Sequence, residues 1–219
     1  MDNFDEFSLV GKDLYMLGLV DSMSGSLSMR IGDRILITKR NAMLGHLKEE
    51  DIVEVPLEGG GKEDAAAKEL QVHRAIYRET SFNAVVHAYP TYGITLSINT
   101  ENKIIPADIK GQTVLRSIPV VRARAASEEL MKFLPPVFKS GYLVSLVKEY
   151  GSFAVGGSLI EALQYTTCLE DSCKIFAINR SLTPVEKPKR PERYERRTAI
   201  PPSIGVMGRP RGGSRGFGR

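Results

Sequence analysis

The stretch VVHAYP, residues 85–90, carries a histidine and a tyrosine two positions apart behind an apolar run. Side chains two positions apart in a β-strand lie on one face, so we expect His87 and Tyr89 side by side at the end of a buried strand. Two imidazoles at this spacing would indicate a metal site, because imidazole nitrogen is a common zinc ligand. A neutral phenol, with a pKa of about 10, is a poor zinc ligand at neutral pH. The chemistry of this strand end therefore depends on what else the fold brings to it.

The elements that must position these residues are mixed along the chain without strict alternation of strand and helix. This order favours a single α/β layered domain over a doubly wound parallel sheet. Apolar spacing and turn residues predict a hairpin over 26–38 that turns at Gly32 and Asp33, extended segments over 51–57, 83–89, 103–109 and 117–123, and two strands over 141–158 that turn at Gly151. Helices are predicted over 4–20, 62–79, 91–99, 127–138 and 159–178, the fourth capped by Ser127 and ended or kinked at Pro135.

Composition is that of an ordinary globular protein, with 219 residues, 42% hydrophobic and 26% charged. No apolar run reaches the roughly 18 residues of a membrane-spanning helix, and the acidic start MDNFDEF lacks the features of a secretory signal. We therefore expect a cytoplasmic protein with no membrane partner. Cys168 and Cys173 lie in one predicted helix and are expected to be reduced, largely buried thiols.

The charge is concentrated at the C-terminal end. From Arg180 onward there are eleven Lys and Arg against three Glu, a net charge of +8, which leaves −4 for residues 1–179. This predicts a folded domain over 1–179 and a basic Pro/Arg/Gly-rich tail over 180–219 with too little apolar surface to fold alone. Arg and Gly interleaved with Tyr194 and Phe217 are typical of RGG segments that bind single-stranded nucleic acid. A solvated or subunit-wrapping extension is the alternative.

The order of short motifs resembles the class II aldolase and adducin family. The matching segments, in chain order, are SMSGSLSMR, ILITKRN, LKEEDIVEV, AKELQVHRAIY, HAYP and EYGSFAVGGSLIEA, within about residues 5–178. The resemblance implies a single three-layer α/β/α domain around a mostly antiparallel sheet. It also implies a homo-oligomer, a ring-like tetramer with sites at subunit interfaces, and an aldehyde-lyase activity that reversibly cleaves a phosphorylated sugar.

The resemblance also implies site residues. In the family three histidines hold a divalent metal, usually zinc, and a glutamate handles protons. Here Glu69 matches the glutamate and His87 the first histidine, whereas Tyr89 and Tyr150 stand at the other two histidine positions. The phosphate-binding positions correspond to Ser24, Gly25, Ser26, Thr38 and Lys68, and Lys39 could also attract an anion.

Several functions remain open at this stage. A zinc-dependent lyase would need ligands beyond His87 and Glu69. In a non-catalytic member, Tyr89 and Tyr150 would fill the metal cavity, with their hydroxyls hydrogen-bonded to Glu69 or His87. One imidazole, two tyrosines and one carboxylate could instead hold ferric iron, which stabilises tyrosinate. A nucleic-acid-associated protein acting through its tail is the fourth possibility. His73, one helical turn after Glu69, is expected to be structural.

Overall fold

The computed structural model describes residues 2–61 and 63–182 of the chain. Its centre is an eight-stranded sheet of order β3-β2-β1-β4-β8-β7-β6-β5. All neighbouring strands pair antiparallel except β6 and β7, which are parallel. The strands are β1 (Ser26–Ile31), β2 (Arg34–Thr38), β3 (Ile52–Pro56), β4 (Ala84–Ala88), β5 (Lys103–Ile104), β6 (Ile118–Val121), β7 (Val144–Val147) and β8 (Gly151–Gly156). The expectation of a mostly antiparallel sheet is confirmed.

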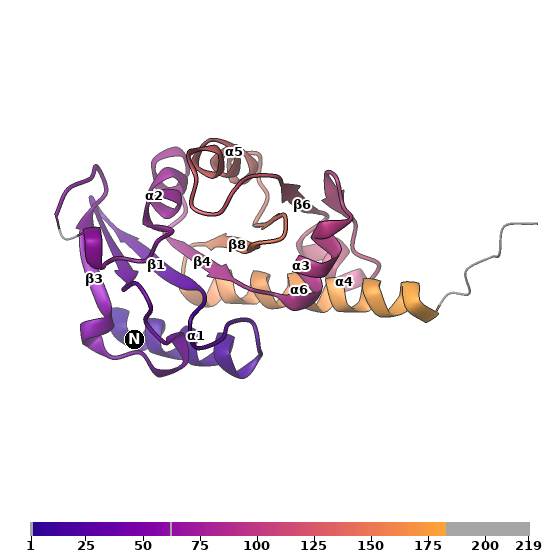
Figure 1. The fold of residues 1–219 in the computed structure, drawn as a ribbon, viewed down its shortest axis with the longest axis horizontal. Coiled ribbons are helices and arrows are strands. Elements are labelled where there is room, and N and C mark those ends of the chain that lie inside the picture. Colours follow the sequence, from indigo (N-terminus) through magenta and orange to yellow (C-terminus); the bar gives the residue numbers. More distant parts are fainter. Residues whose placement is uncertain (1, 62, 183–219) are drawn as a thin grey trace, which may run out of the picture. The chain divides into compact units, whose positions relative to one another are not determined.

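Helices cover both faces of the sheet and complete a three-layer α/β/α domain (Figure 1). One face packs against α1 (Asn3–Met16) and α6 (Leu159–Leu182), and the other against α2 (Leu70–Glu79) and α5 (Glu128–Lys139). The shorter helices α3 (Thr91–Ile98) and α4 (Ile109–Val114) contact α6. Single 3-10 turns occupy Leu44–His46, Glu49–Asp51 and Glu63–Ala65.

The alternation of side chains along β4 decides toward which face of the sheet His87 points. Ala84 and Val86 belong to the core shared with α1 and α6, while Val85 belongs to the core shared with α2 and α5. Because side chains alternate between the faces of a strand, His87 lies on the Val85 face, toward the layer of α2.

One helix prediction needs correction, and the structure decides a second that was left open. The predicted helix over 62–79 is divided into the Glu63–Ala65 turn and α2, with the chain between them bridged to Lys39. The helix that begins after Ser127, whose hydroxyl accepts from the Leu130 N–H, does not end at Pro135 but continues to Lys139. A proline costs an internal hydrogen bond, but the apolar face of this helix is buried, and that burial outweighs the loss.

The last helix extends beyond its predicted end at residue 178. It continues to Leu182, so that residues 180–182 of the predicted tail form its final turn. Residues 183–219, including the RGG-like segment, lie outside the described residues. Cys168 and Cys173 are free and buried in the core beneath α6, as expected.

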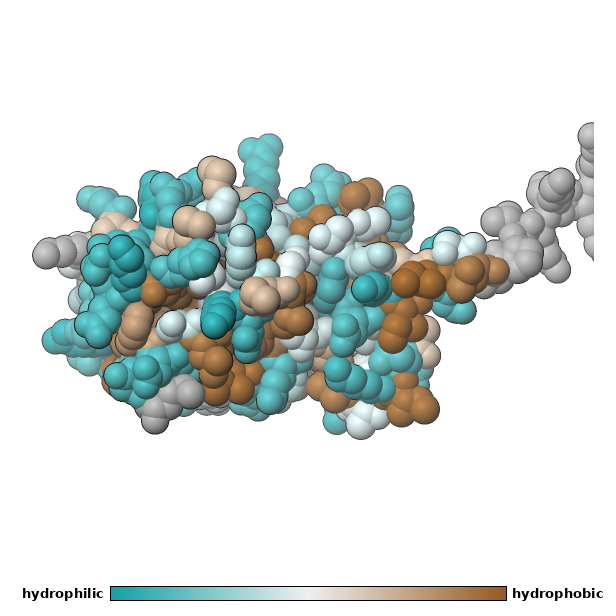
Figure 2. Space-filling view, turned by 90° about the horizontal axis from the view of Figure 1, so that it is seen from below, coloured by the Kyte–Doolittle hydropathy of each residue, from teal (hydrophilic) through white to brown (hydrophobic). Residues whose placement is uncertain are grey.

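Exposed hydrophobic side chains gather toward the C-terminal half of α6 on the face shown in Figure 2. Those of α6 are Ile175, Ile178 and Leu182. Among the described residues no helix is both long and apolar enough to cross a membrane.

Candidate ligand-binding site

Three segments distant in sequence bring the candidate residues together. His87 lies in β4, paired with Phe153 of β8, and Tyr89 follows β4 with its N–H donating to the Leu19 carbonyl over 2.7 Å. Tyr150 ends the turn between β7 and β8, and Glu69 immediately precedes α2. The antiparallel pairing of β4 with β8 is therefore what places His87 beside Tyr150.

The His87 imidazole is fully buried and stacks on the Phe153 ring, with 4.4 Å between centroids and 13° between planes. Its Nδ1 lies 3.0 Å from the Ser152 carbonyl oxygen. Since a carbonyl only accepts, Nδ1 carries the proton and donates, and Nε2 keeps its lone pair. Burial lowers the pKa of His87, against the opposing charge of Glu69, so the ring is neutral. Nε2 is buried without a hydrogen-bond partner among the described residues.

Two tyrosine rings enclose this histidine. The centroids of Tyr89 and Tyr150 lie 5.1 Å and 4.9 Å from that of His87. The Tyr150 hydroxyl donates to Glu69 Oε1 over 2.6 Å. Burial, and then the hydrogen bond to Glu69, raise the pKa of Tyr150. Burial also raises the pKa of Tyr89, which a hydrogen bond with Tyr150 partly offsets. Both phenols are therefore protonated at neutral pH.

Glu69, Tyr89 and Tyr150 form one wall of a pocket of about 290 Å³, whereas His87 is fully buried and does not line it. Chain segment 65–67 runs beside 38–40, through bonds from the Arg40 N–H to the Ala65 carbonyl and from the Ala67 N–H to the Thr38 carbonyl. This pairing places the cationic side chains of Lys39, Arg40 and Lys68 in the same pocket as the Glu69 carboxylate. The complete lining is Met23, Ser24, Gly25, Lys39, Arg40, Asn41, Ala67, Lys68, Glu69, Tyr89, Ala125, Ala126 and Tyr150. Such a pocket attracts anions.

Two of the expected phosphate-binding residues do not line this pocket. Ser26 is fully buried, and its hydroxyl lies 3.1 Å from Nε2 of His73. Thr38 is also buried, and its hydroxyl oxygen accepts from the Leu27 N–H over 3.2 Å. Both occupy strand positions that face the interior. Gly25 does line the pocket, at a φ of +90° where an added Cβ would lie 2.7 Å from Val20 Cγ1, so only glycine fits.

Sequence reasoning missed six lining residues. Arg40 and Asn41 stand at the end of the matching segment ILITKRN, and the adjacent charges were the available signal. Met23, Ala67, Ala125 and Ala126 carry no chemical signal in the sequence. Ala126 is marked in the structure by a left-handed φ of 48°.

His73 lies behind the pocket, not in it. Nδ1 lies 2.7 Å from the Ser28 hydroxyl, which in turn lies 2.7 Å from the Tyr77 hydroxyl. Burial lowers the pKa of His73 to about 3. Through its bonds to Ser26 and Ser28, His73 joins α2 to β1, in keeping with the structural role expected from the sequence.

This burial predicts a pH dependence of stability. The unfolded chain binds a proton at His73 near pH 6.5, but the folded protein does not until pH falls to about 3. One such group lowers the free energy of unfolding by about 1.4 kcal/mol for each pH unit between these values as pH falls. Denaturant unfolding between pH 6.5 and 5 should show a shallower slope for His73→Gln than for His46→Gln, since His46 is exposed. Equal slopes would contradict the prediction.

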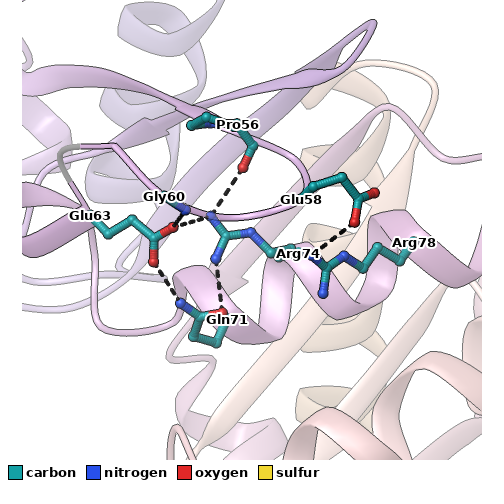
Figure 3. Close-up of polar contacts among 7 residues, drawn as sticks. All are labelled: Pro56, Glu58, Gly60, Glu63, Gln71, Arg74 and Arg78. Atoms are coloured by element: carbon teal, nitrogen blue, oxygen red, sulfur yellow. Dashed lines mark hydrogen bonds and ion pairs between the residues drawn. The ribbon is translucent and has the colours of Figure 1, made fainter.

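A second polar cluster holds the chain that leads to Glu69 (Figure 3). Arg74 of α2, 3% exposed, pairs with Glu63 over 2.8 Å and donates to the Pro56 carbonyl over 3.1 Å. Glu63 also accepts from the Gly60 N–H and from the Gln71 amide. The cluster thereby ties the loop after β3 to the first turns of α2, immediately beside Glu69.

The donor set at the pocket does not fit the zinc site that the resemblance implies. In place of three imidazoles there are one imidazole, His87, and two protonated phenols, and Glu69 accepts a hydrogen bond from one of them. Within residues 2–61 and 63–182 no group of three or more His, Cys, Asp and Glu side chains could hold a metal ion. The raised pKa values of both tyrosines also oppose the phenolates that a ferric site would need.

The family model for the Class II Aldolase and Adducin N-terminal domain matches residues 5–177. An L-fuculose phosphate aldolase from Methanocaldococcus jannaschii is 29% identical over 176 residues, which are 80% of this chain and 95% of that protein. A 3-oxo-tetronate 4-phosphate decarboxylase from Haemophilus influenzae is 28% identical over 179 residues, covering 76% and 83%.

A solved structure is also similar to this chain. The L-fuculose-1-phosphate aldolase from Thermus thermophilus superposes with a TM-score of 0.78 at 34% identity, covering 83% of this chain and 97% of that one.

Proposed function

Because this chain belongs to the class II aldolase and adducin N-terminal domain family, we propose that its pocket binds a phosphorylated sugar or a similar phosphorylated small molecule. The observation that carries the proposal is the presence of Lys39, Arg40 and Lys68 in one pocket with Glu69 and Tyr150. Lysine and arginine are the usual partners of phosphate oxygens, and carboxylate and phenol groups bind sugar hydroxyls. The names of the similar proteins, which act on phosphorylated compounds, support the same ligand class.

The proposal predicts that Lys68→Ala weakens binding of L-fuculose 1-phosphate by at least about tenfold, the equivalent of roughly 1.4 kcal/mol for one charge-assisted contact. Isothermal titration calorimetry with the sugar phosphate, and with inorganic phosphate as a simpler probe, measures this. Lys132→Ala is the matched control, because Lys132 is an exposed lysine of α5 that does not line the pocket. Equal losses in the two variants would place the anion elsewhere.

The lyase chemistry of the family is proposed to be lost or altered in this chain. The Tyr150–Glu69 hydrogen bond supports a changed site, because it occupies the carboxylate that the resemblance assigns to proton transfer. The alternative is an active aldolase with a non-standard metal site formed by His87, Tyr89, Tyr150 and Glu69. A retro-aldol assay on L-fuculose 1-phosphate with added zinc, manganese or iron separates the two, since only the alternative gives turnover that Glu69→Ala abolishes.

A homo-oligomer, a tetramer by the family pattern, and a cytoplasmic location remain proposals. Support for self-association comes from the exposed apolar residues of α6, whose burial against a second copy would be favourable. Light scattering coupled to size-exclusion chromatography would find a particle four times the 24.2 kDa chain mass. A monomer at all concentrations would overturn the proposal.

A further inference from the structure

We infer that this pocket holds its phosphorylated ligand without a metal ion, with Lys39, Arg40 and Lys68 supplying positive charge and Tyr89, Tyr150 and Glu69 supplying hydrogen bonds to ligand hydroxyls. The inference rests on the proposed function for the ligand class. What it adds is the basis of recognition: tyrosines replace the metal, so that the site is complete in its metal-free form.

The first argument is the pairing of Tyr150 with Glu69. The hydroxyl donates to Oε1 over 2.6 Å in a half-buried position, and this is a charge-assisted bond at the short end of its range. A metal ion that used either group would first have to break this bond.

The second argument is the ligand count around His87. This histidine has the tautomer that metal-binding imidazoles use, with Nδ1–H donated to the Ser152 carbonyl and a lone pair on Nε2. Its ring contacts are with Tyr89, Tyr150 and Phe153, and the other buried histidine, His73, is engaged with the hydroxyls of Ser26 and Ser28. Within the described residues no group of three or more His, Cys, Asp and Glu side chains could hold a metal ion. Zinc sites in proteins normally use at least three protein ligands. The single imidazole of His87 is therefore too few ligands for a zinc site, although its tautomer would suit metal binding.

The third argument is the charge of the pocket. Three cationic side chains and one carboxylate line it, which gives a net positive charge without any ion. A bound divalent cation would add to like charge on the rim, whereas a phosphate dianion would offset it. The described side chains therefore favour direct binding of a phosphate. They do not favour a site in which a metal ion binds first and the phosphate binds after it.

The experiment restores what the tyrosines replaced. Zinc is titrated in competition with a chromophoric chelator into the wild-type protein, into the double variant Tyr89→His with Tyr150→His, and into the double variant Tyr89→Phe with Tyr150→Phe. The double histidine variant should bind one zinc per chain at least about 100-fold more tightly than the other two, because it completes a three-imidazole set with His87. The phenylalanine variant controls for loss of the hydroxyls and of the bond to Glu69.

Two zinc results would overturn the inference. The first is wild-type protein that binds near-stoichiometric zinc at micromolar concentration and loses it in His87→Ala. The second is a folded double histidine variant, shown by circular dichroism, that gains no zinc affinity, because the tyrosines would then not be what excludes the metal.

Calorimetry on the wild-type protein decides the matter even if the variants fail to fold. L-fuculose 1-phosphate should bind with the same Kd, within about twofold, in EDTA and in added zinc, since a metal-bridged contact would change it by much more. Binding that requires zinc overturns the inference. If the sugar phosphate does not bind under either condition, the proposed ligand class is wrong, and so is this account of how the ligand is recognised. The zinc titration still reports whether the tyrosines exclude the metal.

Discussion

Replacing Glu63 with alanine is expected to lower the free energy of unfolding by about 3–5 kcal/mol, the usual cost of leaving a buried charge without its partner. Arg74 is only 3% exposed, and its guanidinium pairs with Glu63, whose side chain is 25% exposed. Glu63→Ala therefore leaves a nearly buried cation with only neutral acceptors, the Pro56 carbonyl and the Gln71 amide oxygen. It also removes the acceptor for the Gly60 N–H and the Gln71 amide. Urea unfolding followed by far-ultraviolet circular dichroism measures the loss, since the chain has no tryptophan.

The same loop and the same helix provide the matched control. Glu58 pairs with Arg78 over 3.2 Å, but both side chains are exposed (Figure 3). Exposed ion pairs contribute about 0–1 kcal/mol, so Glu58→Ala should change stability by no more than that. Similar losses in the two variants would show that burial of Arg74 does not decide the energetics of this cluster. Because the cluster anchors the chain that leads to Glu69, we expect Glu63→Ala also to weaken sugar phosphate binding, whereas Glu58→Ala should not.

Phe153→Ala is the second substitution with a large expected effect, about 3–5 kcal/mol of destabilisation from a fully buried phenylalanine. Its ring stacks on His87 at 4.4 Å and meets His73 edge-on at 6.0 Å, so the cavity left behind would border both buried histidines. The free energy of unfolding in urea gives the size of the effect. The ring of His87 would also lose the surface that fixes its plane, so the zinc affinity of the double histidine variant should fall when Phe153→Ala is added.

Phe133→Ala tests whether position, and not residue type, causes the effect. Phe133 lies on α5 and is 53% exposed. Surface substitutions of this kind usually stay within about 0.5 kcal/mol. A loss at Phe133 comparable to that at Phe153 would contradict the assignment of the core on this side of the sheet.

Much of the fold followed from local patterns. The β1–β2 hairpin with its turn at Gly32 and Asp33, the Ser127 cap, and the strand that carries His87 were all predicted, and the structure has each of them. Period-two alternation, turn residues and caps act over a few neighbours, so a sequence displays them directly. The helix predicted over 62–79 was wrong, because the chain before α2 is held by packing and pairing with distant chain segments. The same kind of packing decided that the helix after Ser127 continues past Pro135, where the sequence allowed an end or a kink.

The candidate site shows where sequence alone stops. The motif order identified the family and singled out Glu69, His87, Tyr89, Tyr150 and Lys68, because residue types at fixed spacing are visible in one dimension. Only the tertiary structure brought Tyr150 onto Glu69, 81 residues away, and directed Ser26 and Thr38 into the core while Arg40 joined the pocket. Strand register and the turns between β7 and β8 set those contacts, and register depends on which strands pair. The hydrogen bond between Tyr150 and Glu69 is a property of that pairing.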